Sequence, residues 1–482
     1  MQRRGYYGHI ALLWLLQAIG VACVQDQPLF WDNVLLSGKI PTELYVGRLS
    51  SLFVSERLAG YSPLWGAYIA IGWHWLGRSL AATHWLMLPL LWLISFQMVR
   101  LAQQFVPRRA LGLTLMALLS VPVLAALSVQ CGPDLAMVGF YLAALNAILY
   151  RNRGWLVLVL VVLALVSPRG LWCLVPLFVI DQALVGNKLF SPRWQWALGK
   201  AFAFAPAGLA AAGWYYLQYD HYGWLFADPD GDFASLAAYT TLPEYLRQLG
   251  ICAWRMIDFG QLAVWLPLAG LAIAALRGRA EHVELRGTLA LLTLAPAVAF
   301  ALFFAAFRNP VGHRYMLLPV LFATLWLCYE WAEGLRYARF SRRVWMLVAV
   351  FWTGHLWVAL YPQSWAKGWD ATLLHVQAGA AKRAMAAELV ALPAEAKSQV
   401  GAHFPDADAW EDCFLADWHF APAPYDPTMN AYLLYSNAGN AFEPADVAYL
   451  STYTRPAVVC RYWPVRMELR RNPRVPLKGT IQ

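Results

Sequence analysis

Long apolar runs alternate with short polar connections over the first three quarters of the chain. Runs of roughly 16 to 22 mostly apolar residues recur from Ala11 to Leu360, and each ends at Arg, Lys, Pro or Gly. A bilayer requires about 20 apolar residues per spanning helix, and only helices and closed barrels satisfy their backbone hydrogen bonds in lipid. Because the runs lack the strict alternation of barrel strands, they predict a bundle of spanning helices.

The pattern predicts eleven spanning helices. They lie near 7–24, 79–101, 109–128, 134–150, 155–168, 171–187, 196–218, 261–276, 287–307, 313–331 and 344–361. The apolar segment 62–77 is short and holds His74 and three Trp residues. Counting it as a span would move the Arg- and Lys-rich connections out of the cytoplasm, against the positive-inside rule. We therefore predict that 62–77 is an interfacial or re-entrant helix.

This topology places the N-terminus in the cytoplasm and three segments on the periplasmic side of a bacterial inner membrane. They are the loop 25–78 with its juxtamembrane helices, the acidic loop 219–260 and the tail 362–482. The tail has a helix-like stretch near 370–395 and strand-like runs at Tyr432–Tyr435 and Ala457–Arg461 among turn residues, which is typical of a small α/β domain. The predicted fold class is an all-α polytopic membrane domain, 1–361, followed by a C-terminal α/β periplasmic domain.

Composition agrees with a membrane protein and narrows the partners. The 482 residues are 60% hydrophobic and 13% charged, too apolar for a soluble protein of this size. The formal charge of +9 lies in short loops that set membrane orientation, so it does not indicate a nucleic-acid partner. Seven cysteines without a CxxC motif predict no metal site, and we expect no cofactor. Cys413 and Cys460 share the tail and either form a disulfide or remain separate thiols.

Carboxylates occur at three places on the predicted external side. Asp26 and Asp32 follow the first span, and Asp134 follows a Gly-Pro turn between two later spans. If residues 29–37 are helical, Asp32 and Asn33 lie opposite the apolar side formed by Trp31 and its neighbours. A solvated interfacial helix explains Asp32 equally well, and Asp134 by itself is explained as a helix cap.

Cations occur on the same predicted side, where the positive-inside rule disfavours them. Arg169 lies at the outer end of a span, and His313 and Arg314 precede another. Arginine at headgroup depth is suited to binding phosphate with two hydrogen bonds, although it also snorkels to lipid headgroups. A carboxylate beside such cations favours chemistry on a lipid-linked phosphate. The carboxylate would deprotonate an acceptor hydroxyl, and the cations would stabilise the departing phosphate.

Five short stretches resemble motifs of the GT-C superfamily of membrane glycosyltransferases, which includes protein O-mannosyltransferases and aminoarabinose transferases of lipid A. Phe30-Trp31-Asp32-Asn33 is similar to the Asp-Glu pair after the first span of the family, with Asn33 in place of Glu. The stretch Gly60-Tyr61-Ser62-Pro63-Leu64 is similar to the family's Gly-His-Pro-Pro-Leu, with Tyr61 and Ser62 in place of His and Pro.

The remaining three stretches occur in the family's order along the chain. Pro133-Asp134 matches an Asp between the third and fourth helices, and Pro168-Arg169-Gly170 stands where the family often has Lys or Arg. His313-Arg314-Tyr315 with Pro319 is similar to its Arg-Tyr-Leu-Leu-Pro signature. The wider pattern, including Tyr432-Leu-Leu-Tyr435-Ser436-Asn437, looks closest to GT-C-like proteins of Bacteroidota.

The resemblance implies a glycosyltransferase that uses a polyprenyl-phosphate sugar donor on the periplasmic face. Asp32 would be the catalytic base, with Asp26 as the competing candidate. Arg169, Arg314 and His313 would bind the donor phosphate, and Asp134 and Tyr61 would complete the site. The acceptor would be a lipid, a glycan or a protein. The departures at Asn33, Tyr61 and Ser62 leave two other classes open, a non-catalytic scaffold and a glycolipid transporter.

Overall fold

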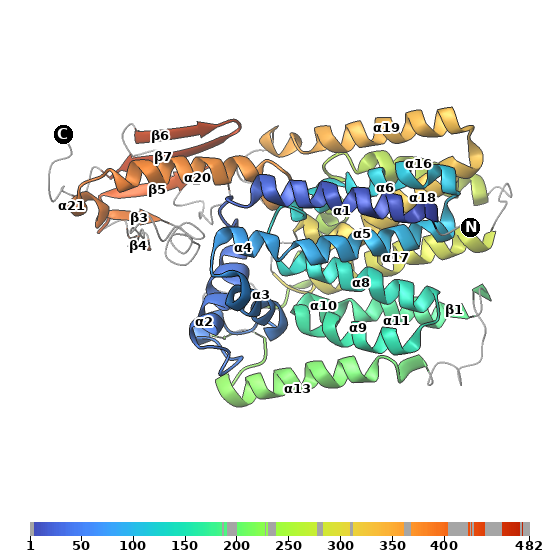
Figure 1. Cartoon of the computed structure of the whole chain (residues 1–482), viewed down its shortest axis with the longest axis horizontal. Coiled ribbons are helices and arrows are strands. Elements are labelled where there is room, and N and C mark those ends of the chain that lie inside the picture. The colour runs from blue at the N-terminus through green and yellow to red at the C-terminus, as the bar shows by residue number, and fades with distance from the viewer. Residues whose placement is uncertain are drawn as a thin grey trace.

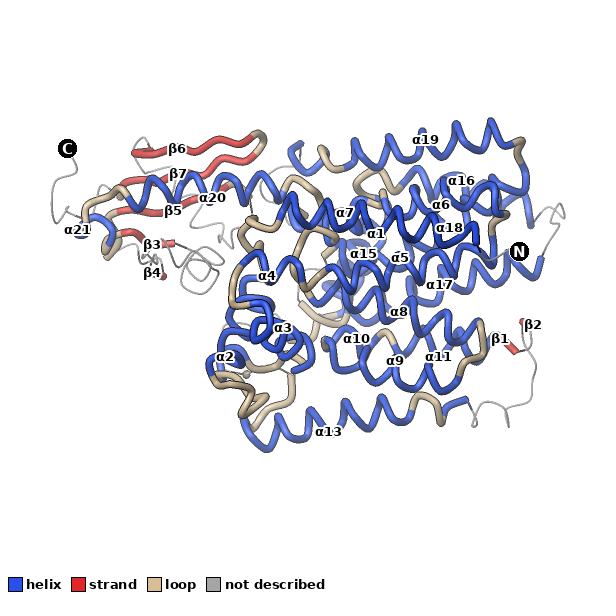
Figure 2. Tube along the Cα trace, viewed as in Figure 1, coloured by secondary structure: helices blue, strands red, loops and turns tan. Residues whose placement is uncertain are grey.

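A computed structural model of the chain shows a bundle of helices with a small sheet at one end (Figures 1 and 2). It describes residues 4–185, 188–189, 200–226, 228–229, 238–276, 283–308, 312–360, 368–402, 423–424, 426, 429–438, 456–472 and 475. Cys413 lies outside these residues, and so does the proposed pairing of Cys413 with Cys460. The predicted combination of a helical chain with a small C-terminal sheet is confirmed.

The N-terminal half of the bundle follows the apolar pattern. Its helices are α1 (Arg4–Val24), α2 (Ile40–Val46), α3 (Pro63–Leu76), α4 (Leu80–Trp85), α5 (Leu88–Phe105), α6 (Arg108–Leu119), α7 (Pro122–Leu127), α8 (Pro133–Leu149), α9 (Arg153–Val166), α10 (Pro168–Trp172) and α11 (Leu174–Ala183). The predicted span 109–128 is divided into α6 and α7, because Pro122 starts a new helix at its first turn. Pro168 likewise begins α10 as a separate helix after α9.

The second half of the bundle contains six longer helices among the described residues. They are α13 (Ala205–Tyr222), α15 (Leu242–Ile257), α16 (Leu262–Leu276), α17 (Val283–Ala305), α18 (Leu317–Gly334) and, packed on the outside, α19 (Tyr337–Gly354). The loop predicted at 219–260 thus includes a helix, α15, which begins with a capping box between Thr241 and Glu244. A bend of 99° separates α15 from α16.

Apolar helices support a membrane location. Within the described residues, three helices are long and apolar enough to cross a bilayer, namely Leu80–Phe105, Glu284–Ala305 and His313–Gly334. The bent pair of α15 and α16 makes a fourth if it is counted as one span. The eleven spans and their orientation remain predictions.

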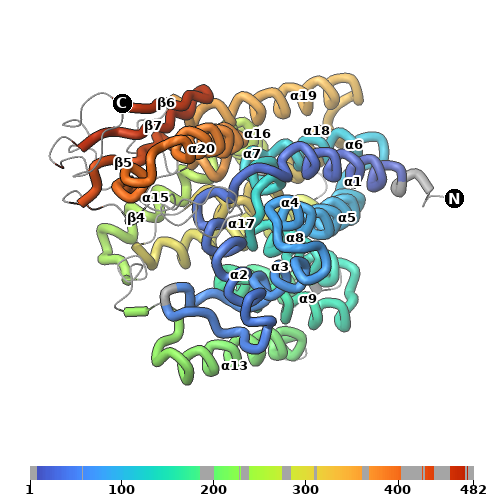
Figure 3. Tube along the Cα trace, turned by 60° about the vertical axis from the view of Figure 1, so that its left-hand side comes forward, coloured from blue at the N-terminus to red at the C-terminus, as the bar shows by residue number. Residues whose placement is uncertain are grey.

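Different parts of the chain lie at the two ends of the bundle. The N-terminus, the hairpin of β1 (Leu184–Val185) with β2 (Lys188–Leu189) and the turn between α18 and α19 lie at one end, on the right of Figure 1. Helices α2, α3 and α20 (His375–Val390) lie at the other end, as does the C-terminal sheet (Figures 1 and 3). The loop that contains Asp32 and the tail therefore share one end of the molecule.

The tail folds into a five-stranded mixed sheet covered by a helix. Its strands are β3 (Val400–Ala402), β4 (Ala423–Pro424), β5 (Tyr432–Ser436), β6 (Pro456–Tyr462) and β7 (Val465–Arg471), in the spatial order β4-β3-β5-β7-β6. Strand β3 pairs parallel with β4 and β5, whereas β7 pairs antiparallel with β5 and β6. Helix α20 packs on β6 and β7, where it buries Met385 and Leu389.

The tail also packs on the bundle. The Arg383 guanidinium on α20 donates a hydrogen bond to the backbone carbonyl of Asp26 at 2.9 Å. The Leu373 amide donates to Nδ1 of His355 at 3.1 Å. A short 3-10 helix, Trp369–Ala371, precedes α20 and is buried at Trp369 and Ala371. These contacts place the beginning of the tail directly on the Asp32 side of the bundle.

We expect docking of the tail to weaken in mild acid, because His375 lies buried at this junction. Its ring is 6% exposed, faces Phe30, and hydrogen-bonds the Thr372 carbonyl through Nδ1 at 2.6 Å. Burial lowers the pKa of His375 from 6.5 to about 4, since a cation there would be desolvated beside His355 and His84. The stabilisation is present above about pH 6.5 and is lost as the pH falls toward 4.

Limited proteolysis of the junction between pH 7.5 and 5 measures this effect, with faster cleavage expected as the pH falls. His375→Gln is expected to flatten the pH dependence, because Gln has no proton to gain. An equally steep dependence in His375→Gln would show that another group is responsible.

Close contact between α9 and α10 depends on a glycine. A Cβ built on Gly170 would lie 1.9 Å from the Leu163 carbonyl oxygen, which is backbone and cannot move aside alone. Gly170→Ala is therefore expected to displace α10, lower the melting midpoint and misplace the adjacent Arg169. Gly154→Ala is the matched control, because nothing lies within 4 Å of its Cβ position. Equal melting midpoints for both variants would contradict the expectation.

Candidate active site

Asp32 is presented by a turn and not by a helix from residue 29. Trp31 has a left-handed φ of 54°, and the helical backbone begins only at Asn33, running through the π-turn Leu35–Lys39 into α2. The prediction that Asn33 lies with Asp32 opposite an apolar side is wrong. Asn33 is 2% exposed, and its Nδ2 donates to Oε1 of Gln130 at 3.4 Å. The reversal at Trp31 therefore turns the neighbouring polar side chains in different directions.

Asp134 lies in the first turn of α8, where Pro133 begins the helix. Its side chain is almost fully buried and contacts Nη1 of Arg169 at 2.5 Å. Ser167 holds the start of α10 by accepting a hydrogen bond from the Gly170 amide at 3.1 Å. The two helix N-termini thus place a carboxylate and a guanidinium against each other across the gap between α8 and α10.

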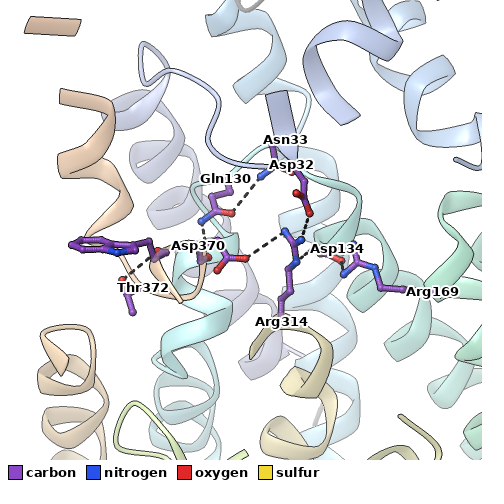
Figure 4. Close-up of polar contacts among 9 residues, drawn as sticks. Asp32, Asn33, Gln130, Asp134, Arg169, Arg314, Asp370 and Thr372 are labelled. Carbon is purple, nitrogen blue, oxygen red and sulfur yellow. Dashed lines mark hydrogen bonds and ion pairs between the residues drawn. The ribbon is translucent and has the colours of Figure 1, made fainter. Parts of the chain in front are cut away.

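Arg314 lies at the centre of the site, in the short helix His313–Met316 before α18. Its side chain is 4% exposed, and each nitrogen faces a different carboxylate (Figure 4). Nη2 contacts Asp32, Nε lies 3.5 Å from Asp134, and Nη1 lies 3.5 Å from Asp370. Five charged side chains from five separate segments, Asp32, Asp134, Asp370, Arg169 and Arg314, therefore form one network, which we call the Arg314 cluster.

Sequence reasoning missed Asp370. It belongs to the tail, in the stretch before α20, and no motif marks it. Gln130 donates from Nε2 to the Asp370 carbonyl at 2.7 Å, which fixes this part of the tail against the turn before α8. Burial raises the pKa of the Asp370 carboxyl above its ordinary value, and the Arg314 guanidinium offsets only part of this effect. Asp32 and Asp134 raise it further.

His313 points away from the Arg314 cluster. Its ring is completely buried, stacks on Phe259 with centroids 4.2 Å apart, and places Nε2 2.7 Å from Oδ2 of Asp258. Arg255 lies 3.2 Å from the same nitrogen. These contacts hold the bend between α15 and α16 against the start of α18. The structure thus brings His313 to a neighbouring group of side chains, and not to the carboxylates around Arg314.

Two tyrosines border the Arg314 cluster. Tyr61, in the segment before α3, lies close enough to Asp32, Arg169 and Arg314 to feel their charges. Burial, followed by the charge of Asp32, raises the pKa of the Tyr61 hydroxyl, so the phenol remains protonated. The ring of Tyr315 lies under both guanidinium groups, 4.6 Å from Arg169 and 5.5 Å from Arg314. In the sequence, Tyr315 was marked only as the residue after Arg314 in the stretch similar to Arg-Tyr-Leu-Leu-Pro.

Asp26 is placed apart from these residues. It is exposed after the end of α1, and its backbone carbonyl contacts Arg383 of the tail. The Asp26 carboxylate lies near enough to interact with His84. The Asp32 carboxylate instead interacts with Tyr61, as do Arg169 and Arg314. Of the two candidate bases, Asp32 is therefore the one beside the arginines.

A small apolar cavity lies next to the Arg314 cluster, between α3 and the ends of α8 and α9. Tyr61 is in its wall, at the side near the charged residues. The rest of the lining comprises Leu36, Ile40, Ser62, Trp65, Gly66, Pro133, Val166, Ser167 and Pro168. An apolar lining beside two arginines suits contact with the hydrocarbon part of a molecule whose polar end reaches the guanidinium groups.

The electrostatics of the Arg314 cluster favour acid–base and phosphate chemistry. Asp32 is 32% exposed, whereas the side chains of Asp134 and Arg314 are nearly buried, so Asp32 is the carboxylate that a second substrate can reach. The guanidinium groups of Arg169 and Arg314 supply donors for an anion in a low-dielectric environment. Among the described residues, no group of three His, Cys, Asp or Glu side chains is arranged to hold a metal ion.

Comparison with known proteins gives a match in fold. No family model and no curated protein sequence matches the chain. The structure of ArnT from Cupriavidus metallidurans bound to undecaprenyl phosphate is similar over 99% of this chain and 98% of that chain, with a TM-score of 0.52 and 14% identity. The apo structure of the same protein aligns with a TM-score of 0.49, at 15% identity over 97% of this chain and 98% of that chain. The chain shares its overall fold with ArnT.

Proposed function

We propose that this protein is a membrane glycosyltransferase that moves a sugar from a polyprenyl-phosphate donor to an acceptor hydroxyl. The observation that supports this most directly is the Arg314 cluster, in which the accessible Asp32 carboxylate contacts the buried Arg314, and Asp134 links Arg314 to the partly buried Arg169. The cluster borders an apolar cavity, in a chain whose fold resembles that of a protein crystallised with undecaprenyl phosphate. A lipid-linked phosphate requires both an apolar cavity and fixed cations.

Each residue of the cluster has a defined role in the proposed reaction. Asp32 accepts the proton of the acceptor hydroxyl as its oxygen bonds to the anomeric carbon. The bond between that carbon and the phosphate oxygen breaks, and its electron pair leaves with the lipid phosphate. Arg314 and Arg169 stabilise the charge that develops on this phosphate. Asp134 orients both guanidinium groups, since it contacts each of them.

The cavity beside Tyr61 supports a lipid donor over a soluble nucleotide sugar. Its lining is almost entirely apolar, and it lies between α3 and the bundle, where a polyprenyl chain could enter from the bilayer. Tyr61 would place its protonated phenol near the phosphate. His313, which packs on Asp258, would support the backbone of Arg314 from behind and would not bind the donor itself.

The acceptor, the sugar and the compartment follow from the sequence only as predictions. We infer that transfer occurs on the periplasmic face, because the Arg-rich connections are expected to remain in the cytoplasm. The acceptor would be a lipid, a glycan or a protein. The sequence resemblance to GT-C-like proteins of Bacteroidota predicts where relatives of the chain occur, and it carries no prediction about the substrate.

Purified protein in lipid nanodiscs with undecaprenyl-phosphate sugars tests the proposal. Release of undecaprenyl phosphate together with a glycosylated acceptor is the expected result. Binding of the donor without turnover would instead favour the scaffold, for which the replacement of His and Pro by Tyr61 and Ser62 is the main support. Movement of labelled donor across a proteoliposome membrane without transfer would favour a transporter.

A further inference from the structure

Each nitrogen of Arg314 faces a carboxylate in the structure. Asp32, Asp134 and Asp370 each face a different edge of the guanidinium (Figure 4). A lipid phosphate that binds Arg314 therefore competes with these carboxylates for the guanidinium. The identity of the displaced group determines how tightly the site holds the donor before transfer and the lipid phosphate after it.

Asp370 is the carboxylate that the phosphate can displace most easily. Asp134 also contacts Arg169 at 2.5 Å, so moving it would break a second ion pair. Asp32 must remain beside the reacting atoms as the base. The Asp370 carboxylate lies 3.5 Å from Nη1 of Arg314, a separation at which an ion pair is weak. It belongs to the tail, which docks on the bundle through other contacts such as the Arg383 hydrogen bond to Asp26.

The reaction increases the negative charge opposite Asp370. The donor is a phosphodiester with one negative charge. When the bond to the sugar breaks, the phosphate retains the electron pair and becomes a monoester with a charge of about −1.5 to −2 at neutral pH. The acceptor proton resides on Asp32 at that moment, so charge is conserved. A carboxylate near Arg314 repels this product more strongly than it repels the donor.

We propose that Asp370 competes with the lipid phosphate for Arg314, so that the site releases polyprenyl phosphate after sugar transfer. This inference rests on the proposed function, because it assumes that Arg314 binds the lipid phosphate. Asp370 touches Arg314 and no substrate atom, so it acts as a positioning residue. The tail therefore contributes a residue to the site. A soluble domain that only flanked the bundle would not compete with the lipid phosphate.

Binding of undecaprenyl phosphate to the full-length protein in detergent micelles tests the proposal without requiring turnover. Asp370→Asn keeps the size of the side chain and its backbone carbonyl for Gln130, but removes the charge. We expect the variant to bind undecaprenyl phosphate at least about fivefold more tightly than the unmodified protein. Glu395→Gln is the matched control, because it removes an exposed charge from α21 (Ala394–Lys397) of the same tail and should leave the affinity unchanged.

An unchanged or weaker affinity in Asp370→Asn would overturn the proposal, since a residue that merely supports Arg314 would weaken binding when altered. Asp370→Ser provides a second variant if the first does not fold. Turnover gives a separate readout, in which Asp370→Asn should retain its first turnover, slow in steady state and show stronger inhibition by added undecaprenyl phosphate.

Failure of this inference and failure of the proposed function give different results. If the unmodified protein binds undecaprenyl phosphate and Arg314→Lys weakens that binding, the phosphate site stands and Asp370→Asn decides the inference alone. If Arg314→Lys has no effect on binding, the phosphate site itself is wrong, and the inference about Asp370 is overturned with it.

Discussion

Asp32→Asn is expected to abolish sugar transfer while leaving donor binding intact. Asparagine is the same size and can accept a hydrogen bond from Arg314, but it cannot take a proton from the acceptor hydroxyl. Loss of a general base typically lowers the rate by about 10²- to 10⁴-fold. The measurement is the single-turnover rate with a saturating polyprenyl-phosphate sugar, together with the affinity for undecaprenyl phosphate.

Asp26→Asn is the matched control for this prediction, because both residues follow the first helix and lose the same charge. Asp26 is exposed and lies on the side of Arg383, so its variant should retain most of the activity. The opposite outcome, a large loss at Asp26 with normal turnover at Asp32, would transfer the role of base to Asp26. Equal and small effects at both positions would remove the proposed proton transfer altogether.

Substitution of Arg314 is expected to lower both stability and activity. Arg314→Met would leave three carboxylates close together without their central cation, at a cost of about 3–5 kcal/mol in the free energy of unfolding. Arg314→Lys retains the charge and should fold, but a single ammonium cannot contact carboxylates on three sides as the planar guanidinium does. We expect its turnover to fall by about 100-fold.

Thermal melting and turnover of the same preparations separate the two effects. Arg308→Lys is the control, because Arg308 pairs with Glu244 in an ion pair in which both side chains are more than 40% exposed. Such an exposed pair contributes little to stability. Adding Asp370→Asn to Arg314→Met should restore part of the melting midpoint, since one of the three repelling charges is removed. No restoration in the double variant would argue against repulsion as the cause.

Local features predicted the parts of the site that lie near helix ends. Pro133 marks the first turn of α8, so Asp134 could be placed at a helix N-terminus from the sequence alone. Arg169 was predicted at the outer end of a span, whereas Pro168 begins the separate helix α10. The contact between Asp134 and Arg169 could not be predicted, because it depends on how α8 and α10 pack. The direction of Asn33 was predicted wrongly, since the left-handed backbone at Trp31 has no signature in its residue type.

Contacts over long sequence separations could not be predicted. Asp370 meets Arg314 through the docking of the tail, and Gln130 reaches the Asp370 carbonyl across 240 residues. His313 and Arg314 are neighbours in the chain, yet one faces Asp258 and the other faces Asp32. Adjacent side chains in a tight helix point in different directions. Which of the two reaches the Arg314 cluster and which reaches Asp258 therefore depends on the segments packed around the helix.

The amino-acid sequence alone determined the helical, membrane-embedded character of the chain, because runs of apolar residues of this length favour helices in lipid whatever their neighbours are. It also located the strand-forming segments around Tyr432 and Ala457 by their local pattern. Only the tertiary structure decided which charged side chains meet. A buried ion pair depends on the packing of distant segments, so no periodic pattern in the sequence predicts it. For that reason Asp370 appeared as part of the Arg314 cluster only when the tail was seen docked on the bundle.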